Sequence, residues 1–468
     1  MDLTTELLHF LPAIITSLAG LAAMMFAAYQ TDMRTVWAVS TGAVLLAFAL
    51  SVRDLLGDEG VLFSGMVAYG GSAAFGSMVV LLGTFFTFLI ARDYLEKIRH
   101  HYGEVYALML FATTGMIVLA SSTDLVSTFV GLETMSICLY VLAGLVKEEK
   151  RSIEAALKYF LLGAFSTGFF LYGIALLYGA SGSTSLAVIG AVTQKGILYW
   201  AGVALLLTGF FFKISAVPFH MWTPDVYQGA PTPVTAYMAT AAKTSAFVAL
   251  ILILARGLQG SVAGWAPVFE IIAMATMVVG NLIALAQHNI KRMLAYSSIA
   301  HAGYALVGLT AGTFAGYDGV LFYLFAYTLM NIGAFAVLGY YETSGNREIV
   351  NLEHVAGLGF QKPLMAVFLS VFLFSLAGMP PFAGFAGKYL VFAAAIEQGY
   401  LWLALIGVLT SAAAAFYYIR VMVYLYFREP EMDITLGEAP KLAMAAVALL
   451  AFLTLYFGVN PGSIVNLF

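Results

Sequence analysis

Titratable side chains lie inside the apolar runs of this sequence, at positions where a proton could be held and passed on. Lys213, Lys243 and Lys388 fall within hydrophobic segments, and so do Glu133 and His301. A charged side chain near the bilayer centre costs about 2.5 to 3.5 kcal/mol, so such groups usually face a bundle interior and mark ion or proton paths. Lysine suits a relay because its surroundings can favour either its charged or its neutral form. These residue types predict a buried proton relay.

Two segments combine a lysine with a helix-breaking proline. The stretch "FFFKISAVPFH" has Lys213 shortly before Pro218, and "GMPPFAGFAGKYLVF" has Lys388 beyond Pro380 and Pro381. Proline removes a backbone donor and frees carbonyl groups that lipid cannot satisfy, so each break must line protein or water. We therefore expect two broken helices, each beside a lysine. Proline kinks without a function are the alternative.

The composition places these segments in a membrane. The 468 residues are 62% hydrophobic and 10% charged, and the mean hydropathy is +0.93. Apolar runs of about 20 residues recur along the whole chain, as a hydrocarbon core about 30 Å thick requires of helices. We predict an all-α polytopic membrane protein with about fourteen transmembrane helices, at residues 9–29, 36–52, 72–91, 104–120, 124–146, 154–179, 197–216, 232–255, 268–287, 294–312, 319–342, 363–379 continuing to 397, 401–427 and 441–459.

The two breaks fall in the seventh and twelfth predicted spans, which are five spans apart. Because five is odd, corresponding spans cross the membrane in opposite directions, and this predicts two inverted five-helix repeats, spans 4 to 8 and spans 9 to 13. The chain then divides into N-terminal helices (1–103), a first repeat (104–256), a second repeat (257–428) and a C-terminal helix (429–468). Discontinuous helices at corresponding positions of two inverted halves indicate a transport site.

Basic residues in the predicted loops decide the orientation. The loops after odd-numbered spans hold thirteen Lys and Arg residues: Arg34, Arg92, Lys97, Arg99, Lys147, Lys150, Arg151, Lys291, Arg292, Arg347, Lys362, Arg428 and Lys441. The opposite loops hold three: Arg53, Lys195 and Arg256. By the positive-inside rule both termini should face away from the cytoplasm. Five basic residues remain within the spans: Lys158, Lys213, Lys243, Lys388 and Arg420.

These five cations lie at different distances from the ends of their predicted helices. Lys243 lies about a dozen residues from the start of its predicted helix, too deep for its stem to reach either headgroup layer. Small neighbours there leave room for water or a close helix. Lys158 lies about one turn into its span, and Arg420 lies near the end of its own. For these two, snorkelling to the membrane surface is the alternative to a buried role.

Glu133 and His301 stand at corresponding positions of the predicted repeats. A buried carboxylate without a partner takes up a proton, whereas a nearby lysine would keep it ionised. His301 exchanges protons near neutral pH. It shares one helix face with Ser297 and Tyr304, which lie at i, i+4 and i+7 spacing. A satisfied core histidine is the alternative to a relay role.

Several classes of function find no support in the composition. The net charge is -4 and there is no basic run that could contact nucleic-acid phosphates. The single cysteine, Cys138, lies in an apolar run and excludes disulfides and iron–sulfur clusters within the chain. No histidine spacing argues for a metal. We expect a lipid bilayer around the chain, no nucleic-acid partner, and neither a metal nor a cofactor bound to the chain itself.

Three motifs together resemble a known family. "FKISAVPFHMWTPDVYQGAPTP", "IKRMLAYSSIAHAGY" and "GMPPFAGFAGKYLVF" are similar to the antiporter-like membrane subunits of respiratory complex I. Within that family they look most like the N type of NADH-quinone oxidoreductase, the mitochondrial ND-two type. The M and L types and the Mrp cation antiporters usually show a Leu-Pro-Asp-Ala variant of the first motif, and the M type commonly has glutamate in place of Lys388. The resemblance covers essentially the whole chain.

The resemblance implies proton translocation driven by quinone reduction in other subunits. Glu133 and Lys213 would form a carboxylate–lysine pair beside the first break, His301 would bridge the halves, and Lys388 would be the terminal lysine. The complete relay it implies is Glu133, Lys158, Lys213, Lys243, His301 and Lys388. It also implies that NADH, flavin, iron–sulfur clusters and quinone bind to partner subunits, that neighbouring membrane, peripheral and antiporter-like subunits surround this chain, and that the complex sits in a bacterial inner membrane.

Two other interpretations stay open at this point. A stand-alone Mrp-like cation/proton antiporter subunit would use the same lysine relay without electron transfer. A structural scaffold would use the polar residues only to hold helices together, and changes at Lys213 or Lys388 would then alter assembly and leave proton flux intact.

Overall fold

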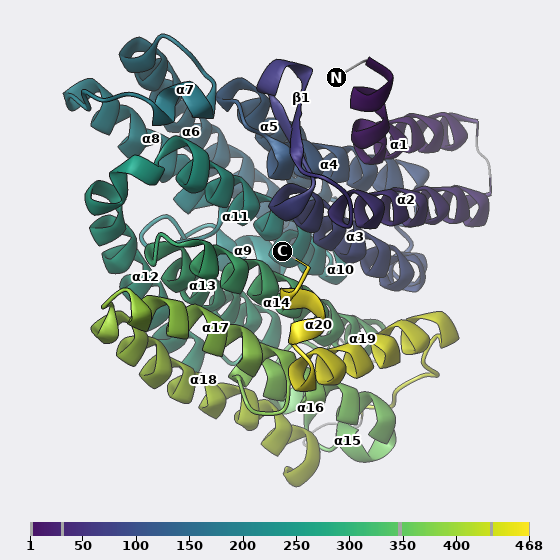
Figure 1. Cartoon of the computed structure of the whole chain (residues 1–468). Coiled ribbons are helices and arrows are strands. Elements are labelled where there is room, and N and C mark those ends of the chain that lie inside the picture. Colours follow the sequence, from purple (N-terminus) through teal and green to yellow (C-terminus); the bar gives the residue numbers. More distant parts are fainter. Residues whose placement is uncertain (1–2, 30–31, 345–348, 431–433, 468) are drawn as a thin grey trace.

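The computed structural model describes residues 3–29, 32–344, 349–430 and 434–467, and helices dominate it (Figure 1). The long helices are α1 (Leu3–Ala28), α2 (Met33–Leu55), α3 (Gly71–Lys97), α4 (Gly103–Ser121), α5 (Leu125–Ala143), α6 (Lys150–Ser181), α8 (Ile197–Lys213), α11 (Lys243–Leu252), α12 (Val262–Leu285), α13 (Ile290–Thr310), α14 (Phe314–Ser344), α16 (Pro363–Ala377), α17 (Ala383–Glu397), α18 (Leu401–Phe427) and α19 (Lys441–Val459). Short elements complete the described chain: α7 (Leu186–Gly190), α9 (Thr223–Gly229), α10 (Thr232–Tyr237), α15 (Leu358–Gln361), α20 (Gly462–Val465), and the antiparallel strands β1 (Gly60–Leu62) and β2 (Val67–Tyr69).

The prediction of an all-α polytopic membrane protein is confirmed. Eleven of the described helices, some joined to their neighbours, are long and apolar enough to cross a membrane, and α8 and α16 are shorter apolar helices. Every predicted span falls on at least one described helix: the tenth falls on α13, and the twelfth falls on α16 followed by α17. The β1–β2 hairpin and α7 were not among the predicted elements. Of the basic residues used for orientation, Arg347 lies outside the described residues.

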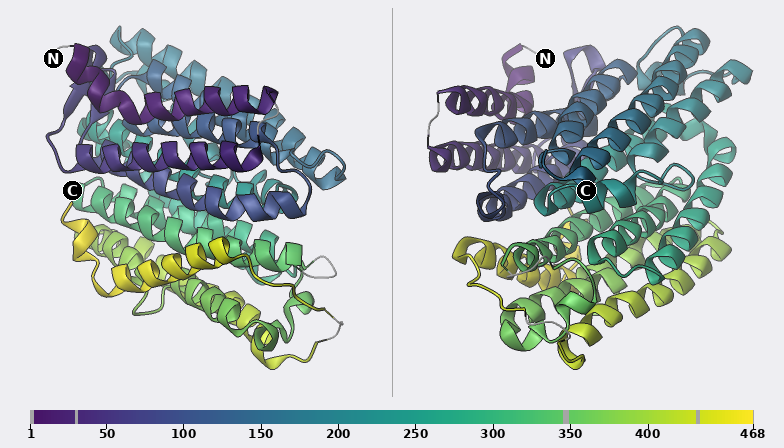
Figure 2. Two further views of the ribbon diagram at one scale, coloured as in Figure 1. Left: turned by 90° about the vertical axis from the view of Figure 1, so that its right-hand side faces the viewer. Right: turned by 180° about the vertical axis from the view of Figure 1, so that it is seen from behind.

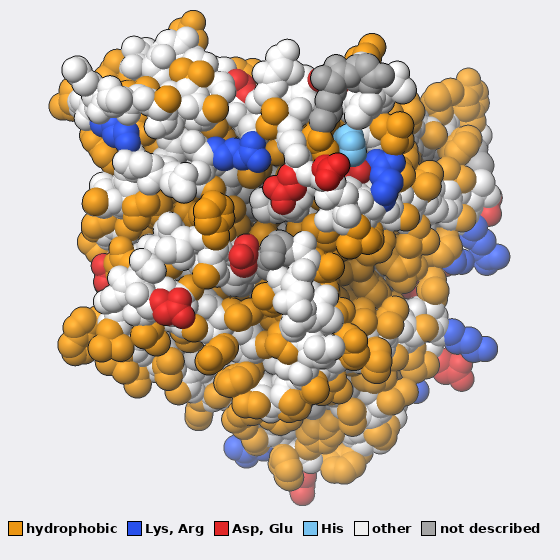
Figure 3. All heavy atoms as spheres, viewed as in Figure 1, with side chains coloured by type: hydrophobic (Ala, Val, Ile, Leu, Met, Phe, Trp, Pro, Cys, Tyr) orange, Lys and Arg blue, Asp and Glu red, His pale blue; other side chains and the backbone are white. Residues whose placement is uncertain are grey.

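The helices run side by side in one bundle, and the chain begins and finishes at the same end of it (Figure 2). Helices α3 and α14 and the segment from α10 through α11 are buried over most of their apolar length, whereas α1, α2, α6, α18 and α19 lie at the periphery. Hydrophobic side chains cover much of the face seen in Figure 3, and charged ones are sparse there. Such an apolar exterior suits contact with lipid or with other membrane subunits.

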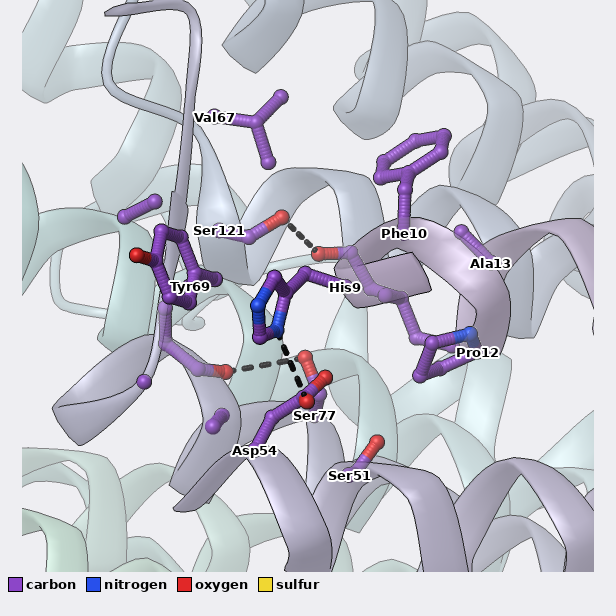
Figure 4. Close-up of a pocket in the computed structure, with 15 residues that line it drawn as sticks. His9, Phe10, Pro12, Ala13, Ser51, Asp54, Val67, Tyr69, Ser77 and Ser121 are labelled. Atoms are coloured by element: carbon purple, nitrogen blue, oxygen red, sulfur yellow. Dashed lines mark hydrogen bonds and ion pairs between the residues drawn. The ribbon is translucent and has the colours of Figure 1, made fainter. Parts of the chain in front are cut away.

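The N-terminal helices are fastened to the hairpin by a polar cluster (Figure 4). His9 on α1 contacts Asp54 at the end of α2, with 3.0 Å between Nδ1 and Oδ1, and Asp54 is buried. Arg53 also hydrogen-bonds Asp54. The His9 ring stacks on Tyr69 of β2, with centroids 4.1 Å apart. This cluster therefore joins α1, α2 and the hairpin at one end of the bundle.

The predicted break after Lys213 is present. Helix α8 ends at Lys213, Ser215 adopts a positive φ of 64°, and a cis peptide bond precedes Pro218. Phe219 stacks back on Phe211 of α8, with ring centroids 6.4 Å apart. After the break, α9 and α10 continue the chain, and a π-helical turn, Met238–Ala242, connects α10 to α11.

The second predicted break has the same backbone geometry. Helix α16 ends at Ala377, Gly378 adopts a positive φ of 83°, and a cis peptide bond precedes Pro381. Phe382 stacks on Phe374, with centroids 6.1 Å apart. The turn residue, the proline and the two phenylalanines each follow their counterparts in the first break by 163 positions. A positive φ favours glycine, so Gly378 is the less strained of the two turn residues.

The two halves also share neighbour relations between helices. Helix α4 packs on α5 as α12 packs on α13, and α11 packs on α4 as α18 packs on α12. Glycines lie at the first two contacts: Gly131 approaches the backbone of Leu119 on α4, and Gly303 approaches the backbone of Met277 on α12. The predicted repeats require these relations, while their residue bounds stay a prediction.

Candidate functional site

Lys213 is buried at the end of α8, beside the first break. Its Nζ donates to Ser136 Oγ at 2.7 Å and to Tyr140 Oη at 3.1 Å, both on α5. The rings of Tyr140 and Tyr159 lie 5.3 and 6.0 Å from the same atom. Hydroxyl acceptors and aromatic faces thus solvate this ammonium group, which a dry apolar interior would not do.

Glu133 lies one turn before Ser136 on α5 and accepts a hydrogen bond of 2.7 Å from Thr167 Oγ1 on α6. Among the described residues no ion pair joins Glu133 to Lys213. The expected carboxylate–lysine pair is therefore not in direct contact in this structure, because Ser136 and Tyr140 occupy the ammonium while the carboxylate turns towards α6. Glu133 is a neighbour of Lys213 along α5, and its relay role stays a prediction.

Lys158 on α6 belongs to an ionic network, whereas snorkelling to the membrane surface would leave its ammonium group unpaired. Its Nζ lies 2.6 Å from Glu154 Oε1 and 2.6 Å from Asp225 Oδ2 on α9. The other oxygen of Asp225 lies 2.6 Å from Arg292 on α13. Asp225 thus bridges two cations from different helices. Asp225 lies in the first of the three family motifs, but its role could not be predicted from the sequence because its partners come from distant parts of the chain.

Lys243 begins α11 directly after the π-helical turn and is 3% exposed. Its Nζ donates to Ser298 on α13 twice, to the backbone oxygen at 2.8 Å and to Oγ at 2.6 Å. The ring of Tyr227 lies 6.0 Å from this nitrogen. The position confirms the predicted depth of Lys243, which has no carboxylate within 4 Å among the described residues.

His301 lies one turn after Ser298 on α13 and is buried. Its Nδ1 lies 2.5 Å from Tyr323 Oη on α14, and its Nε2 lies 3.1 Å from Tyr418 Oη on α18. The Tyr418 hydroxyl also hydrogen-bonds Ser297. His301 therefore sits where three helices meet, and the predicted grouping of His301 with Ser297 on one helix face is confirmed.

Tyr304 connects His301 to the second break. Its ring lies edge-on to the His301 ring, with the two centroids 5.6 Å apart. Nζ of Lys388 on α17 lies 4.6 Å from the centroid of the Tyr304 ring. The hydroxyl of Tyr304 accepts from Asn281 Nδ2 at 3.0 Å, and Asn281 Oδ1 accepts from Tyr417 at 3.0 Å. One aromatic residue thus contacts both predicted relay groups.

Lys388 is buried on α17 and points back to the end of α16. Its Nζ donates to the backbone oxygens of Leu376 and Ala377, both at 3.1 Å, and to Ser411 Oγ at 2.7 Å. The carbonyl end of a helix carries partial negative charge, which favours a cation there. A largely apolar cavity of about 720 Å³ lies beside Lys388 and Ser411, between α17 and α18.

Arg420 has a structural explanation that the sequence did not offer. Its guanidinium donates to the backbone oxygens of Leu285 at 2.9 Å and Gln287 at 2.6 Å. Both lie at the C-terminal end of α12, where carbonyl groups lack partners within the helix. Arg420 therefore caps α12 from α18 and does not join the groups around His301.

The structure brings the predicted residues together in two groups. Lys158 and Lys213 lie on either side of Tyr159, around α9. Lys243, His301 and Lys388 line up along α13 through Ser298 and Tyr304. Sequence reasoning missed Tyr323 and Tyr418, since a tyrosine in an apolar helix gives no signal of its own. Within the described part of the chain, no group of three or more His, Cys, Asp or Glu side chains could hold a metal ion.

The sequence of this chain matches a known protein family. Residues 122–413 match the family described as "NADH:quinone oxidoreductase/Mrp antiporter, TM". The protein named NADH-quinone oxidoreductase subunit N of Salinibacter ruber is 46% identical, and the match covers 98% of this chain and 96% of that protein.

Solved structures show the same fold. A chain of the respiratory complex I of Thermus thermophilus with bound aureothin superposes with a TM-score of 0.85 at 37% identity, covering 97% of this chain and 98% of that one. A chain of the Mrp complex from a Dietzia species gives a TM-score of 0.87 at 21% identity, covering 98% and 96%, which shows a shared fold alone. This chain therefore belongs to the family of NADH:quinone oxidoreductase and Mrp antiporter membrane subunits.

Proposed function

We propose that this chain is the N-type, proton-translocating membrane subunit of an NADH-quinone oxidoreductase, complex I. The observation that carries the proposal is the succession of buried side chains along α13: Lys243 donates to Ser298, His301 follows one turn later, and Tyr304 contacts both His301 and Lys388. Burying three proton-binding side chains in an apolar bundle costs free energy, and such groups usually mark ion or proton paths. The names of the similar proteins and the complex I structure support the same function.

In this proposal six side chains carry the protons: Glu133, Lys158, Lys213, Lys243, His301 and Lys388. Lys213 exchanges a proton through the hydroxyls of Ser136 and Tyr140, and Glu133 lies one turn away on the same helix. Movement of the Glu133 carboxylate towards Lys213 would favour the charged lysine, and its retreat towards Thr167 would favour proton release.

The second half of the relay runs along α13. Lys243 passes its proton across Ser298 to His301, whose two ring nitrogens contact hydroxyls on α14 and α18. Imidazole accepts a proton at one nitrogen and releases it at the other, so it suits the centre of a relay. Lys388, beside the second break, receives the proton last and lies next to the cavity between α17 and α18.

The redox chemistry belongs to other subunits in this proposal. NADH, flavin, iron–sulfur clusters and quinone would bind there, and this chain would contribute to a translocase as a membrane subunit beside further antiporter-like and peripheral subunits. The division at residues 103, 256 and 428 into N-terminal helices, two repeats and a C-terminal helix is part of the same proposal. So are the bacterial inner membrane and the placement of both termini on the non-cytoplasmic side.

The test is gentle purification of the tagged chain from its native membrane, with identification of its partners and an assay of quinone reduction coupled to proton uptake. We expect co-purification with flavin and iron–sulfur subunits, and loss of proton movement in the assembled Lys243→Met complex. Recovery with antiporter subunits only would favour the Mrp-like alternative, which the shared fold permits. Normal proton-to-electron stoichiometry in assembled Lys243→Met would end the relay proposal.

A further inference from the structure

A polar cavity of about 490 Å³ lies at the end of the bundle where α3 and α14 end and α13 begins. We call this end the basic face, after Lys97, Arg99, Arg151 and Lys291, which line the cavity. Five further titratable side chains line it: Tyr94, His100, Glu148, Glu149 and Glu342. The pKa of the exposed Glu148 carboxyl is lowered by its own backbone N–H and by the His100 ring, which lies 3.0 Å away. Charged walls of this kind hold water.

A buried ion pair forms the floor of this cavity. Lys291 Nζ lies 3.5 Å from Glu342 Oε1, and the two side chains are 8% and 16% exposed. Lys291 donates to the backbone oxygen of Ala230 at 2.9 Å, and Glu342 accepts from Tyr94 at 3.1 Å and from the Thr232 hydroxyl. A buried pair is weak grounds for stability, because removing two charges from water offsets much of their attraction. Its position between water and the interior suggests another role.

Two helices lead from this floor to Lys243. Helix α10 begins at Thr232 and continues through the π-helical turn to Lys243. Helix α13 carries Lys291 in its first turn and Ser298, the acceptor of Lys243, about two turns later. Lys291 and Ser298 therefore share α13, and Thr232, which donates to Glu342 of α14, begins the helical segment that leads to Lys243.

A buried tyrosine lies close to Lys243. Tyr227 is fully buried, and its ring lies 6.0 Å from Lys243 Nζ. Its hydroxyl faces Ser298, the residue that accepts from Lys243. Lys291 donates to the backbone oxygen of Ala230, three residues after Tyr227. Hydroxyl groups both donate and accept hydrogen bonds, so Tyr227 and Ser298 offer a route from the ion pair to Lys243.

We propose that Lys291 and Glu342 form the proton intake through which the relay is filled from the basic face. Glu342 takes a proton from a hydronium ion in the cavity, leaving water and a neutral carboxyl group. Lys291 then lacks its counter-charge and releases its proton along the hydroxyls of Tyr227 and Ser298 to neutral Lys243. The proton on Glu342 moves to Lys291, which restores the ion pair. This inference rests on the proposed function, since it names the entrance to that same relay.

The first experiment uses the assembled complex in sealed membrane vesicles with the basic face outward. In Glu342→Gln we expect the rate of quinone-driven proton uptake to fall at least about tenfold, as is typical when a positioned proton-transfer group is lost. Glu342→Asp keeps a carboxylate and should restore most of it. The matched control is Glu149→Gln, an exposed carboxylate on the cavity wall, which should pump normally. Unchanged uptake in assembled Glu342→Gln would overturn the proposal.

The second experiment blocks the cavity without disturbing assembly, because each protein is measured before and after labelling. Cys138 is the single cysteine and is buried, so Cys138→Ser provides the background. A bulky membrane-impermeant maleimide on Thr343→Cys, inside the cavity, should abolish most proton uptake. The same reagent on Lys150→Cys, outside it, should change nothing. Equal uptake before and after labelling of Thr343→Cys would overturn the intake.

Lys243→Met separates failure of the intake from failure of the relay. If Lys243→Met stops proton uptake while Glu342→Gln and the labelled Thr343→Cys chain pump normally, the relay stands and this entrance is wrong. If Lys243→Met also pumps normally, the proposed function itself fails.

Discussion

The two broken helices share a backbone and differ in charge. Both turn through a residue with positive φ, a proline and a stacked phenylalanine, at a constant separation of 163 residues. By the same separation Lys213 corresponds to Leu376, and Asp225 corresponds to Lys388. The first break thus presents a cation before the turn and an anion after it, whereas the second presents a single cation after the turn.

The difference lies in how each cation is balanced. At the first break, Asp225 bridges Lys158 and Arg292, and Glu154 also pairs with Lys158. In the second half, Lys388 has no carboxylate within 4 Å among the described residues, and two carbonyls and one hydroxyl support it. Dipoles stabilise a charge less than a full counter-charge does. The same backbone therefore places an ion-paired anion after the turn in one half and a cation without a paired carboxylate at the corresponding position in the other.

The largest expected effect comes from removing the unbalanced cation. Lys388→Met should lower the rate of proton pumping by about tenfold or more in the assembled complex, because a proton-binding group is lost. Lys388→Arg should fail as well, since arginine keeps its charge but does not release a proton. Proton uptake per quinone reduced is the measurement. If Lys388→Arg pumps normally, a fixed charge suffices and the contrast between the halves is wrong.

A smaller effect is expected when the second turn receives the residue of the first. Gly378→Ser places a Cβ 2.8 Å from Lys388 Cδ and 3.0 Å from its Nζ, and a positive φ costs a residue other than glycine about 1 to 2 kcal/mol. Lys388 should leave its carbonyl acceptors, and pumping should fall severalfold. Ser215→Gly is the reciprocal control and should retain pumping. The ratio of the two rates measures how far the turns are interchangeable.

Removing Asp225, the anion beside the first break, should have a moderate effect on stability. Asp225→Asn leaves Arg292 without its ion-pair partner and Lys158 with Glu154 alone. We expect the free energy of unfolding to fall by about 1 kcal/mol after solvent screening, since Asp225 is 30% exposed. Thermal unfolding of the purified protein measures it. A double-mutant cycle with Arg292→Gln should return a coupling energy of similar size. Additive effects of the two substitutions would mean that the network does not act as a unit.

The smallest effect on pumping is expected at Arg420, which lies in the second half but outside the relay. Arg420→Met removes two hydrogen bonds from the end of α12 and should lower the free energy of unfolding by about 1 to 2 kcal/mol. Proton uptake per assembled complex should not change. Reduced stoichiometry at normal stability would place Arg420 in the proton path and extend the relay beyond Lys388.

The sequence predicted the helices well because membrane spans are set by apolar length, and it predicted both breaks because proline and glycine act locally. The contacts of the site depend instead on packing between distant helices. Lys213 meets Ser136 rather than Glu133 because of how α5 rotates against α8, and no local pattern encodes that rotation. Asp225 and Tyr418 became visible only once α9, α13 and α18 were placed together.

The π-helical turn before Lys243 has a consequence for insertions and deletions. A π turn holds one residue more than an α turn, so it lets a helix gain a residue while its ends stay in place. Deleting one residue from Met238–Ala242 would close the bulge and rotate Lys243 by about 100° relative to α10, away from Ser298. A deletion in the second π turn, Ile253–Gly257, follows Lys243 and would leave its direction intact. The number of residues between α10 and Lys243 therefore sets the direction in which the buried ammonium group points.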